Sequence, residues 1–319
     1  MVKPLPATIL SGFFGAGKTT LLRHILHDNH GEKIAVIENE FGESPIDNRI
    51  LGEGATRITT LSNGCICCSS ANELQNALLD LLTGIDQGKL TFTRLIIECT
   101  GMADPGPVIQ TFFSHPLLSE RFLLDGVITL VDAVHADRQL TDFTVAQAQV
   151  GFADRILLTK TDIATDYDGL LERLQTINAR APIVTVLNGQ IGLASLFNID
   201  GFILSDRLEL ARPRFRPLVA PQTRIKSLVV TLTLPLALAA VSDLMEMLLA
   251  TYADNLLRYK GILAIKDEPR RLLFQGVQRL YSADWDRNWE ADEARTSVMV
   301  FIGIDLPEQE IRAGFAALQ

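Results

Sequence analysis

Short apolar runs alternate with amphipathic stretches along the first two thirds of the chain. The apolar runs are rich in leucine and β-branched residues, which is typical of buried parallel strands; they are ATILSG, KIAVIE, TRITTLS, RLIIECT, DGVITLVDA, ADRILLTK and PIVTVLN. Stretches with helical periodicity separate several of them, namely TTLLRHILHD, ANELQNALLDLL and TDFTVAQAQVGFA. This alternation predicts an α/β domain over residues 1–205, with a mostly parallel sheet covered by helices on both faces.

The pattern changes in residues 206–224. This stretch contains ARPRFRPLVAPQTR, which combines prolines and arginines without helical or strand periodicity and predicts a linker. Residues 225–319 then predict a smaller α+β domain. Its expected elements are a strand (SLVVTLTL), a helix over 237–257, two strands (KGILAIKD and LLFQGVQRLY), a strand (TSVMVFIGI) and a closing helix from Pro307.

Composition narrows the classes of partner. The net charge is −9 and no basic run stands out, which argues against binding to nucleic acid or to an anionic membrane. The longest uncharged stretch, 227–242, is shorter than a membrane span and contains Pro235. No secretion signal is recognised at the N-terminus, and the chain has only four cysteines. We therefore expect a cytoplasmic protein whose partners are small molecules or other proteins.

A glycine-rich motif, GFFGAGKT, follows the first predicted strand and fits the pattern G-x-x-x-x-G-K-[ST]. Glycines let successive main-chain N–H groups turn toward a phosphate, and the helix that follows directs its positive end to the same anion. The predicted phosphate-binding residues are Gly12, Gly15, Ala16, Gly17, Lys18, Thr19 and Thr20, with Thr19 also as a Mg²⁺ ligand. A helix-capping glycine turn is the alternative, and the glycine order does not match a dinucleotide-binding loop.

Two further strands end in residues that suit a nucleotide site. RLIIECTG places Glu98 at the end of an apolar strand, where we expect it beside Mg²⁺, and Gly101 three residues later, where its N–H can contact the γ-phosphate. Glu98 could alternatively end a buried strand facing solvent. ILLTKTD supplies Thr159, Lys160 and Asp162, a variant of the N/T-K-x-D motif that selects guanine. In this order, the motifs favour GTP over ATP.

Three of the four cysteines, Cys65, Cys67 and Cys68, lie in the segment GCICCSS before a predicted helix. A helix N-terminus lowers the pKa of a thiol and favours the thiolate, which is the form that binds a transition metal. A closed structural zinc site normally has four ligands, and no second C-x-x-C pair exists in the chain. Redox chemistry is the main alternative, although bridges between such close cysteines are strained. An inert buried thiol suits Cys99 better.

Further ligands are needed to complete such a metal site. The segment IENEFGESPID offers Glu38 and Glu43, on a loop that in P-loop GTPases responds to the γ-phosphate. If these carboxylates and the thiols share one ion, GTP would hold the metal and hydrolysis would release it. His115 is a weaker candidate ligand. For catalysis we expect Lys18 to stabilise developing charge, with Glu98 and Asp47 as candidate water-positioning groups.

The segments GFFGAGKT, ENEFGE, GCICC, ECTGMADP and TKTD occur in an order and spacing that resemble those of the CobW-type GTPases. The resemblance extends to RYKG and LLFQGVQ in the second domain. It implies slow, Mg²⁺-dependent hydrolysis of GTP to GDP, binding of zinc, cobalt or nickel near Cys65, Cys67 and Cys68, and delivery of the metal to a client metalloprotein. It also assigns Lys18 and Thr19 to phosphate and Mg²⁺, and Lys160 and Asp162 to guanine. Thr159 departs from the asparagine of many members.

The resulting hypothesis is a metallochaperone that couples a transition metal to the GTP cycle. Two alternatives remain at this stage: a metal buffer or sensor that binds nucleotide with little turnover, and a P-loop ATPase or kinase of a small metabolite. The C-terminal domain is a candidate for client docking or for self-association into a homo-oligomer.

Overall fold

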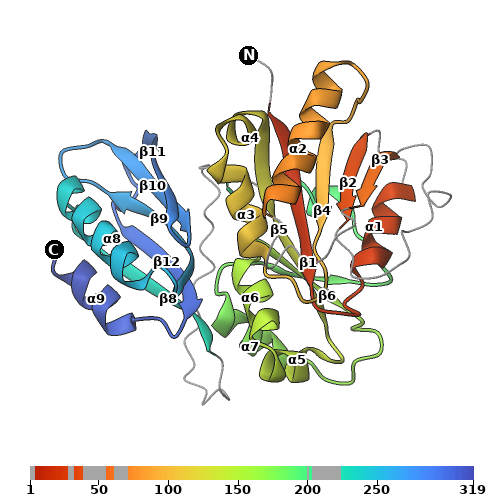
Figure 1. The fold of residues 1–319 in the computed structure, drawn as a ribbon. Coiled ribbons are helices and arrows are strands. Elements are labelled where there is room, and N and C mark those ends of the chain that lie inside the picture. Colours follow the sequence, from red (N-terminus) through yellow and green to blue (C-terminus); the bar gives the residue numbers. More distant parts are fainter. Residues whose placement is uncertain (1–3, 28–31, 39–54, 61–70, 200, 203–223) are drawn as a thin grey trace. The chain divides into compact units, whose positions relative to one another are not determined.

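The computed structural model of the protein describes residues 4–27, 32–38, 55–60, 71–199, 201–202 and 224–319 (Figure 1). The chain forms two compact units. The first comprises Met1–Leu174 and Arg180–Ile203, and the second comprises Gln175–Ala179 and Leu204–Gln319. Most of the predicted linker lies outside the described residues. None of the described helices combines the length and apolarity needed to cross a bilayer.

Within its described residues, the first unit contains a seven-stranded parallel sheet in the order β3-β2-β4-β1-β5-β6-β7. The strands match the seven predicted apolar runs. They are β1 (Leu5–Gly12), β2 (Ile34–Glu38), β3 (Ala55–Thr60), β4 (Arg94–Glu98), β5 (Phe122–Asp132), β6 (Arg155–Thr159) and β7 (Ile183–Val186). Burial on both faces explains why the central strands β1, β4 and β5 are largely apolar.

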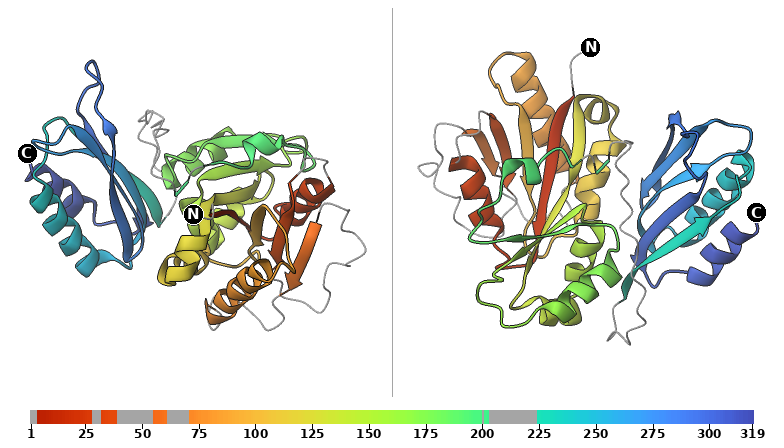
Figure 2. Two further views of the ribbon diagram at one scale, coloured as in Figure 1. Left: turned by 90° about the horizontal axis from the view of Figure 1, so that it is seen from above. Right: turned by 180° about the vertical axis from the view of Figure 1, so that it is seen from behind.

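Helices cover both faces of this sheet, as predicted (Figure 2). They are α1 (Lys18–His27), α2 (Ala71–Asp86), α3 (Pro105–Ser114), α4 (Pro116–Arg121), α5 (Ala136–Asp142), α6 (Thr144–Phe152) and α7 (Asp168–Ile177), with a 3₁₀ turn, η1, at Leu193–Ser195. On one face, α1 shares a core with the segment that contains Leu196 and Phe197. The single helix expected over TDFTVAQAQVGFA is interrupted, because Phe143 is extended and separates α5 from α6.

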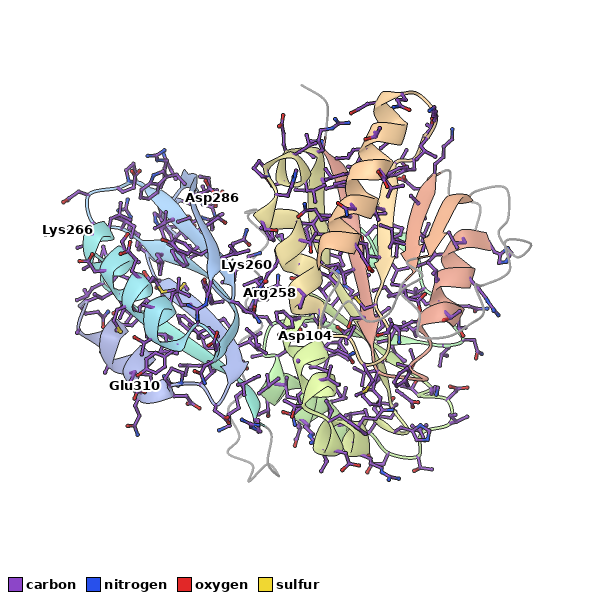
Figure 3. All side chains as sticks on the ribbon, in the orientation of Figure 1. Asp104, Arg258, Lys260, Lys266, Asp286 and Glu310 are labelled. Carbon is purple, nitrogen blue, oxygen red and sulfur yellow. The ribbon has the colours of Figure 1, made fainter. Side chains whose placement is uncertain are left out.

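The second unit has an antiparallel sheet in the order β11-β10-β9-β12-β8 over the described residues 224–319. Its elements are β8 (Ile225–Leu232), α8 (Leu238–Tyr252), β9 (Leu256–Ala264), β10 (Arg270–Val277), β11 (Leu280–Asn288), β12 (Ser297–Ile304) and α9 (Glu308–Ala316). A separate apolar core joins one sheet face to α8 and α9. Tyr259 belongs to this core, whereas its neighbours Arg258 and Lys260 alternate to the other face (Figure 3).

Two expected elements of this unit were placed wrongly. The helix predicted over 237–257 ends at Tyr252, because the chain turns, with Asn255 N–H donating to the Tyr252 carbonyl, and Leu256 already belongs to β9. The strand predicted over LLFQGVQRLY is divided by a turn in which Gln278 has a φ of 51°, and β11 follows that turn.

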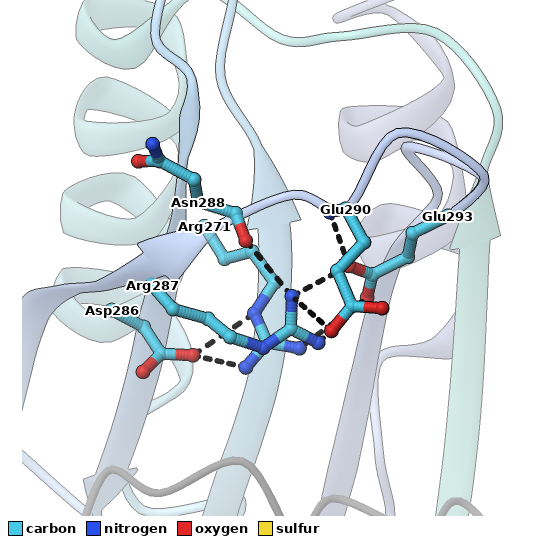
Figure 4. A network of polar contacts seen from close by, with 6 residues as sticks. All are labelled: Arg271, Asp286, Arg287, Asn288, Glu290 and Glu293. Carbon is cyan, nitrogen blue, oxygen red and sulfur yellow. Dashed lines mark hydrogen bonds and ion pairs between the residues drawn. The ribbon is translucent and has the colours of Figure 1, made fainter.

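Charged side chains fasten β10 and β11 to the turn that follows them (Figure 4). The Arg271 guanidinium donates to the Asp286 carboxylate, with Nε at 2.9 Å, and Arg287 Nη1 lies 2.7 Å from Glu293 Oε2. Glu293 also accepts from the Glu290 N–H at 3.0 Å. Arg271 and Arg287 both donate to the Glu293 carboxylate, so this network connects β10, β11 and the turn in one polar cluster.

Candidate functional site

The Gly12–Thr19 loop connects β1 to α1 at the carboxyl edge of the parallel sheet. Gly12, Gly15 and Gly17 have φ values of 138°, 74° and 99°, which side chains of L-residues rarely allow. A Cβ on Gly12 would also lie 2.5 Å from the Leu130 carbonyl oxygen. The loop is closed by Ala16, whose N–H donates to the Phe13 carbonyl at 3.2 Å. The predicted strand, loop and helix arrangement is therefore present, with Thr20 exposed in the first turn of α1.

Lys18 opens α1, and its ammonium group folds back onto the loop. Lys18 Nζ donates to the carbonyl oxygens of Gly12 at 2.7 Å and Phe13 at 3.2 Å. Burial lowers the pKa of Lys18, while the nearby charge of Glu98 acts in the opposite direction. The cation is thus held inside the loop and next to an acid, which is where the sequence motif predicts a phosphate ligand.

Thr19 and Glu98 are brought together, as the sequence predicted. Thr19 Oγ1 donates to Glu98 Oε1 at 3.3 Å, although 79 positions separate the two residues. The pairing arises because β4 lies beside β1, with Glu98 in register with Leu10 two residues before the loop. Glu98 is only 7 % exposed, so it does not simply end a strand in solvent. A hydroxyl beside a carboxylate is a hard oxygen donor set of the kind that Mg²⁺ prefers.

Gly101 lies against the same loop. A Cβ on Gly101 would stand 2.5 Å from the Phe14 ring and 2.7 Å from the Phe14 main-chain nitrogen. The segment is held by Gln149 of α6, whose Nε2 donates to the carbonyls of Gly101 at 3.1 Å and Ala103 at 3.0 Å. It ends at Asp104, which caps α3 by accepting from the Gly106 N–H (Figure 3). Gln149 was missed because a glutamine in an amphipathic helix carries no local signal.

Thr159 ties the end of β6 to the loop. Thr159 Oγ1 lies 2.9 Å from the Ala16 carbonyl oxygen and 3.2 Å from that of Val131. The side chain that departs from the more usual asparagine thus joins two strands to the loop. Lys160 follows with a φ of 59°, and its carbonyl accepts from the N–H groups of Ile163 and Ala164. This turn leaves Asp162 exposed, as a base-reading carboxylate requires.

Asp132, at the end of β5, is a site residue that the sequence analysis missed. Its Oδ2 lies 2.5 Å from Lys160 Nζ and 3.0 Å from His135 Nδ1. The available signal was the same as for Glu98, namely an apolar strand that ends in an acid at the carboxyl edge of the sheet.

Only some of the predicted metal ligands lie within the described residues. Glu38 ends β2, and its main chain is in register with that of Glu98. Glu43, Asp47, Cys65, Cys67 and Cys68 lie outside the described residues. Within the described part of the chain, no group of three or more His, Cys, Asp or Glu side chains is arranged to hold a metal ion.

His115 is not brought to the loop. It separates α3 from α4, and α4 leads into Phe122, which pairs with Leu5 at the beginning of β1. Arg121, at the end of α4, is bound to Asp86 at the end of α2. His115 therefore belongs to the edge where the strands begin, across the length of the sheet from Gly12.

This parallel sheet, the positive-φ glycines and the buried lysine define the first unit as a P-loop nucleotide-binding domain. Family models agree: one described as "CobW/HypB/UreG, nucleotide-binding domain" matches residues 6–185, and one described as "Cobalamin synthesis protein cobW C-terminal domain" matches residues 225–319. The chain belongs to the CobW/HypB/UreG family. The resemblance predicted from the sequence is thereby confirmed.

Individual relatives match over the whole chain. It is 62 % identical over 318 residues to the zinc chaperone YjiA of Escherichia coli, covering 100 % of both chains, and 32 % identical over 344 residues to the zinc chaperone CobW of Pseudomonas aeruginosa, covering 96 % and 89 %. Among solved structures, the zinc-bound YjiA GTPase from E. coli has a TM-score of 0.86 at 62 % identity, with full coverage of both chains. A zinc-bound YjiA variant with one glutamate and two cysteines replaced by alanine gives 0.88 at 57 % identity, again with full coverage.

Proposed function

We propose that the protein is a Mg²⁺-dependent GTPase whose nucleotide cycle controls the binding and delivery of a transition metal, with zinc as the first candidate. The observation that carries the proposal is the meeting of Lys18, Thr19 and Glu98 around one glycine loop. Full-length similarity to a zinc chaperone supports the metal. Cobalt and nickel remain alternative cargoes, since the thiolate and carboxylate ligands proposed here suit all three ions.

The residues around the loop have distinct roles in this proposal. Lys18 binds the β- and γ-phosphates of GTP, and the loop N–H groups surround them. Gly101, held against Phe14, directs its N–H to the γ-phosphate. Lys160 and Asp162 bind guanine, with Thr159 fixing their strand to the loop. Glu98 and Asp47 are the candidate groups for positioning water.

Mg²⁺ fits the pair formed by Thr19 and Glu98. Both side chains offer oxygen, and the buried Glu98 carboxylate supplies the negative charge that a divalent ion needs. When bound, Mg²⁺ neutralises charge on the phosphate oxygens. Thr19 would hold the ion through its hydroxyl, and Glu98 would orient the water molecules bound to it.

The cargo metal is proposed to bind Cys65, Cys67 and Cys68 together with Glu38 or Glu43. Glu38 supports coupling between the two sites, because its main chain lies in register with that of Glu98 at the same sheet edge. A change in the loop that follows β2 would therefore reach both the nucleotide and the metal. We propose that GTP holds the metal and that hydrolysis releases it to a client metalloprotein in the cytoplasm. We also propose that the C-terminal unit mediates self-association.

The test is the zinc affinity of the protein with GDP and with a non-hydrolysable GTP analogue. Because a relative still binds zinc after a glutamate and two cysteines are replaced, total bound zinc is not decisive. The decisive quantity is the ratio of the two affinities. We expect at least about a tenfold ratio, which corresponds to about 1.4 kcal/mol of coupling.

Cys67→Ala should abolish this ratio. Cys99→Ala is the matched control, since it also removes a thiol, but one that is fully buried. It should retain the ratio. Equal affinities in both nucleotide states would instead indicate a metal buffer, and preference for ATP over GTP would indicate an ATPase or kinase.

A further inference from the structure

Asp132 is a buried carboxylate that gathers donors from two elements. It is 1 % exposed and stands at the carboxyl end of β5. Its Oδ2 accepts from Lys160 Nζ at 2.5 Å and from His135 Nδ1 at 3.0 Å. Its Oδ1 accepts from the N–H groups of Val134 at 2.9 Å and His135 at 3.3 Å. Both oxygens are therefore fixed in direction.

Lys160 is constrained at both ends. Its main chain has a φ of 59°, and the preceding Thr159 is bound to the phosphate loop through Ala16 and accepts from the Ala133 N–H. Its ammonium group is bound to Asp132, while the side chain remains 34 % exposed. A free lysine side chain loses conformational entropy when it is ordered. Asp132 removes part of that cost before any ligand arrives.

The charges support this arrangement. Burial acts to raise the pKa of Asp132, but the hydrogen bonds from Lys160, His135 and the Val134 N–H outweigh it, so the pKa lies below its ordinary value. Asp132 is thus ionised at neutral pH, and its negative charge balances the positive charge of Lys160. An ammonium group already paired with a carboxylate is a poor phosphate ligand, whereas the methylene stem of the lysine stays available to an apolar ring.

We propose that Asp132 is a positioning residue for nucleobase recognition: it holds Lys160 extended so that the lysine stem packs on a purine ring beside Asp162. The inference rests on the proposed function, because it deepens the guanine site. The ligand class is the purine base and not the phosphate chain. Asp132 itself touches neither.

The test is a double-mutant cycle on nucleotide affinity with Asp132→Asn, Lys160→Met and the double variant. GDP, IDP and ADP are titrated, and inorganic tripolyphosphate is measured in parallel. We expect Asp132→Asn to weaken GDP binding about tenfold, the size of one hydrogen bond to a charged group. Tripolyphosphate affinity should change less than about twofold. The double variant should bind GDP no more weakly than Lys160→Met alone, since Asp132 acts through Lys160.

Additive losses in the double variant, or equal losses for GDP and tripolyphosphate, would overturn the proposal. Asp142→Asn is the matched control, because it changes an exposed carboxylate paired with Arg138 on α5. If Asp132→Asn does not fold, Asp132→Glu carries the same cycle, with a smaller loss of GDP affinity expected. Wild-type protein that binds no nucleotide would refute the proposed function itself. Binding of ADP in place of GDP would refute guanine selection and with it the base contact proposed for Lys160 and Asp162.

Discussion

At the scale of single residues, Cys99 shows how burial in the fold keeps a thiol protonated. It is the cysteine that the described part of the chain contains, and it is fully buried directly after Glu98. Burial raises the pKa of Cys99 from 9.0 to about 12, and the nearby charge of Lys18 opposes this only in part. At neutral pH the group stays a thiol, so it is a poor metal ligand.

Cys99 should make the first unit less stable in alkali. Because its pKa is higher in the folded state, its contribution is complete below pH 9 and is lost as pH rises from 9 toward 12. The expected loss is about 1.4 kcal/mol by pH 10. Urea unfolding of wild type and Cys99→Ala at pH 8 and pH 10 checks this. The variant should lose less between the two values, and parallel losses in both proteins would contradict it.

Gly101→Ala should weaken nucleotide binding. The added Cβ would stand 2.7 Å from the Phe14 main-chain nitrogen, which a side-chain rotation cannot relieve. Overpacking of this kind costs about 1–3 kcal/mol, and we expect GDP affinity to fall about tenfold or more. Gly169→Ala in α7 is the control, since its Cβ meets no described heavy atom within 4 Å. Titration of GDP against both variants gives the comparison, and equal affinities would refute the close-approach role.

Residue roles were predictable where a motif is local. The Gly12–Thr19 loop could be recognised because spacing in the chain already specifies the turn, and Glu98 followed once that loop was assigned. Gln149 contacts Gly101 and Ala103, which lie 48 and 46 positions away, and no local pattern sets it apart. Asp132 shares the strand-ending pattern of Glu98, but its contact with Lys160, 28 positions away, becomes visible only in the fold. His115 was proposed from its residue type and its place after the ECTG segment, and the order of helices puts it between α3 and α4, away from the Gly12–Thr19 loop.

At the scale of elements, one buried ion pair anchors the segment that leaves the first unit. Arg94 begins β4, and its Nη1 lies 2.8 Å from Asp125 Oδ2 in β5, with both side chains at most 5 % exposed. Asp125 also accepts from the N–H groups of Asn198 and Ile199, and Arg94 stacks on Phe197 at 4.1 Å. The segment after η1 is thus held by the strands themselves.

Asp125→Asn should destabilise the first unit strongly. The change leaves the Arg94 charge buried without its partner, and such losses cost about 3–5 kcal/mol. Asp86→Asn is the matched control, because Asp86 is an exposed carboxylate that pairs with Arg121. Exposed pairs contribute little, so this variant should unfold at the wild-type midpoint. Urea midpoints of the two variants provide the measurement, and similar midpoints would show that the buried pair does not anchor the segment.

Elements were predicted well where burial on both faces makes a strand largely apolar, as in the central strands β1, β4 and β5 of the first sheet. Prediction failed at the boundaries in the second unit. Residues 256–257 are leucines that fit a helix and a strand equally, so α8 was extended into β9. The turn at Gln278 has no glycine or proline, which hid the break between β10 and β11.

At the scale of the whole molecule, the two units contain separate cores. We therefore expect two thermal transitions. Saturating GDP should stabilise the first unit alone, by about 2.7 kcal/mol at one hundred times the dissociation constant. Calorimetry with and without GDP, with the fragment 224–319 as the reference for the second transition, tests this. A single transition that shifts as a whole would contradict independent units.

Release of the metal on GTP hydrolysis can be followed in a single turnover of protein loaded with GTP, Mg²⁺ and zinc, in which phosphate and chelator-bound zinc are measured together. We predict that both products form with one rate constant, and that zinc stays bound when a non-hydrolysable analogue replaces GTP. Release of zinc at the same rate with GTP, with the analogue and with GDP would contradict the claim.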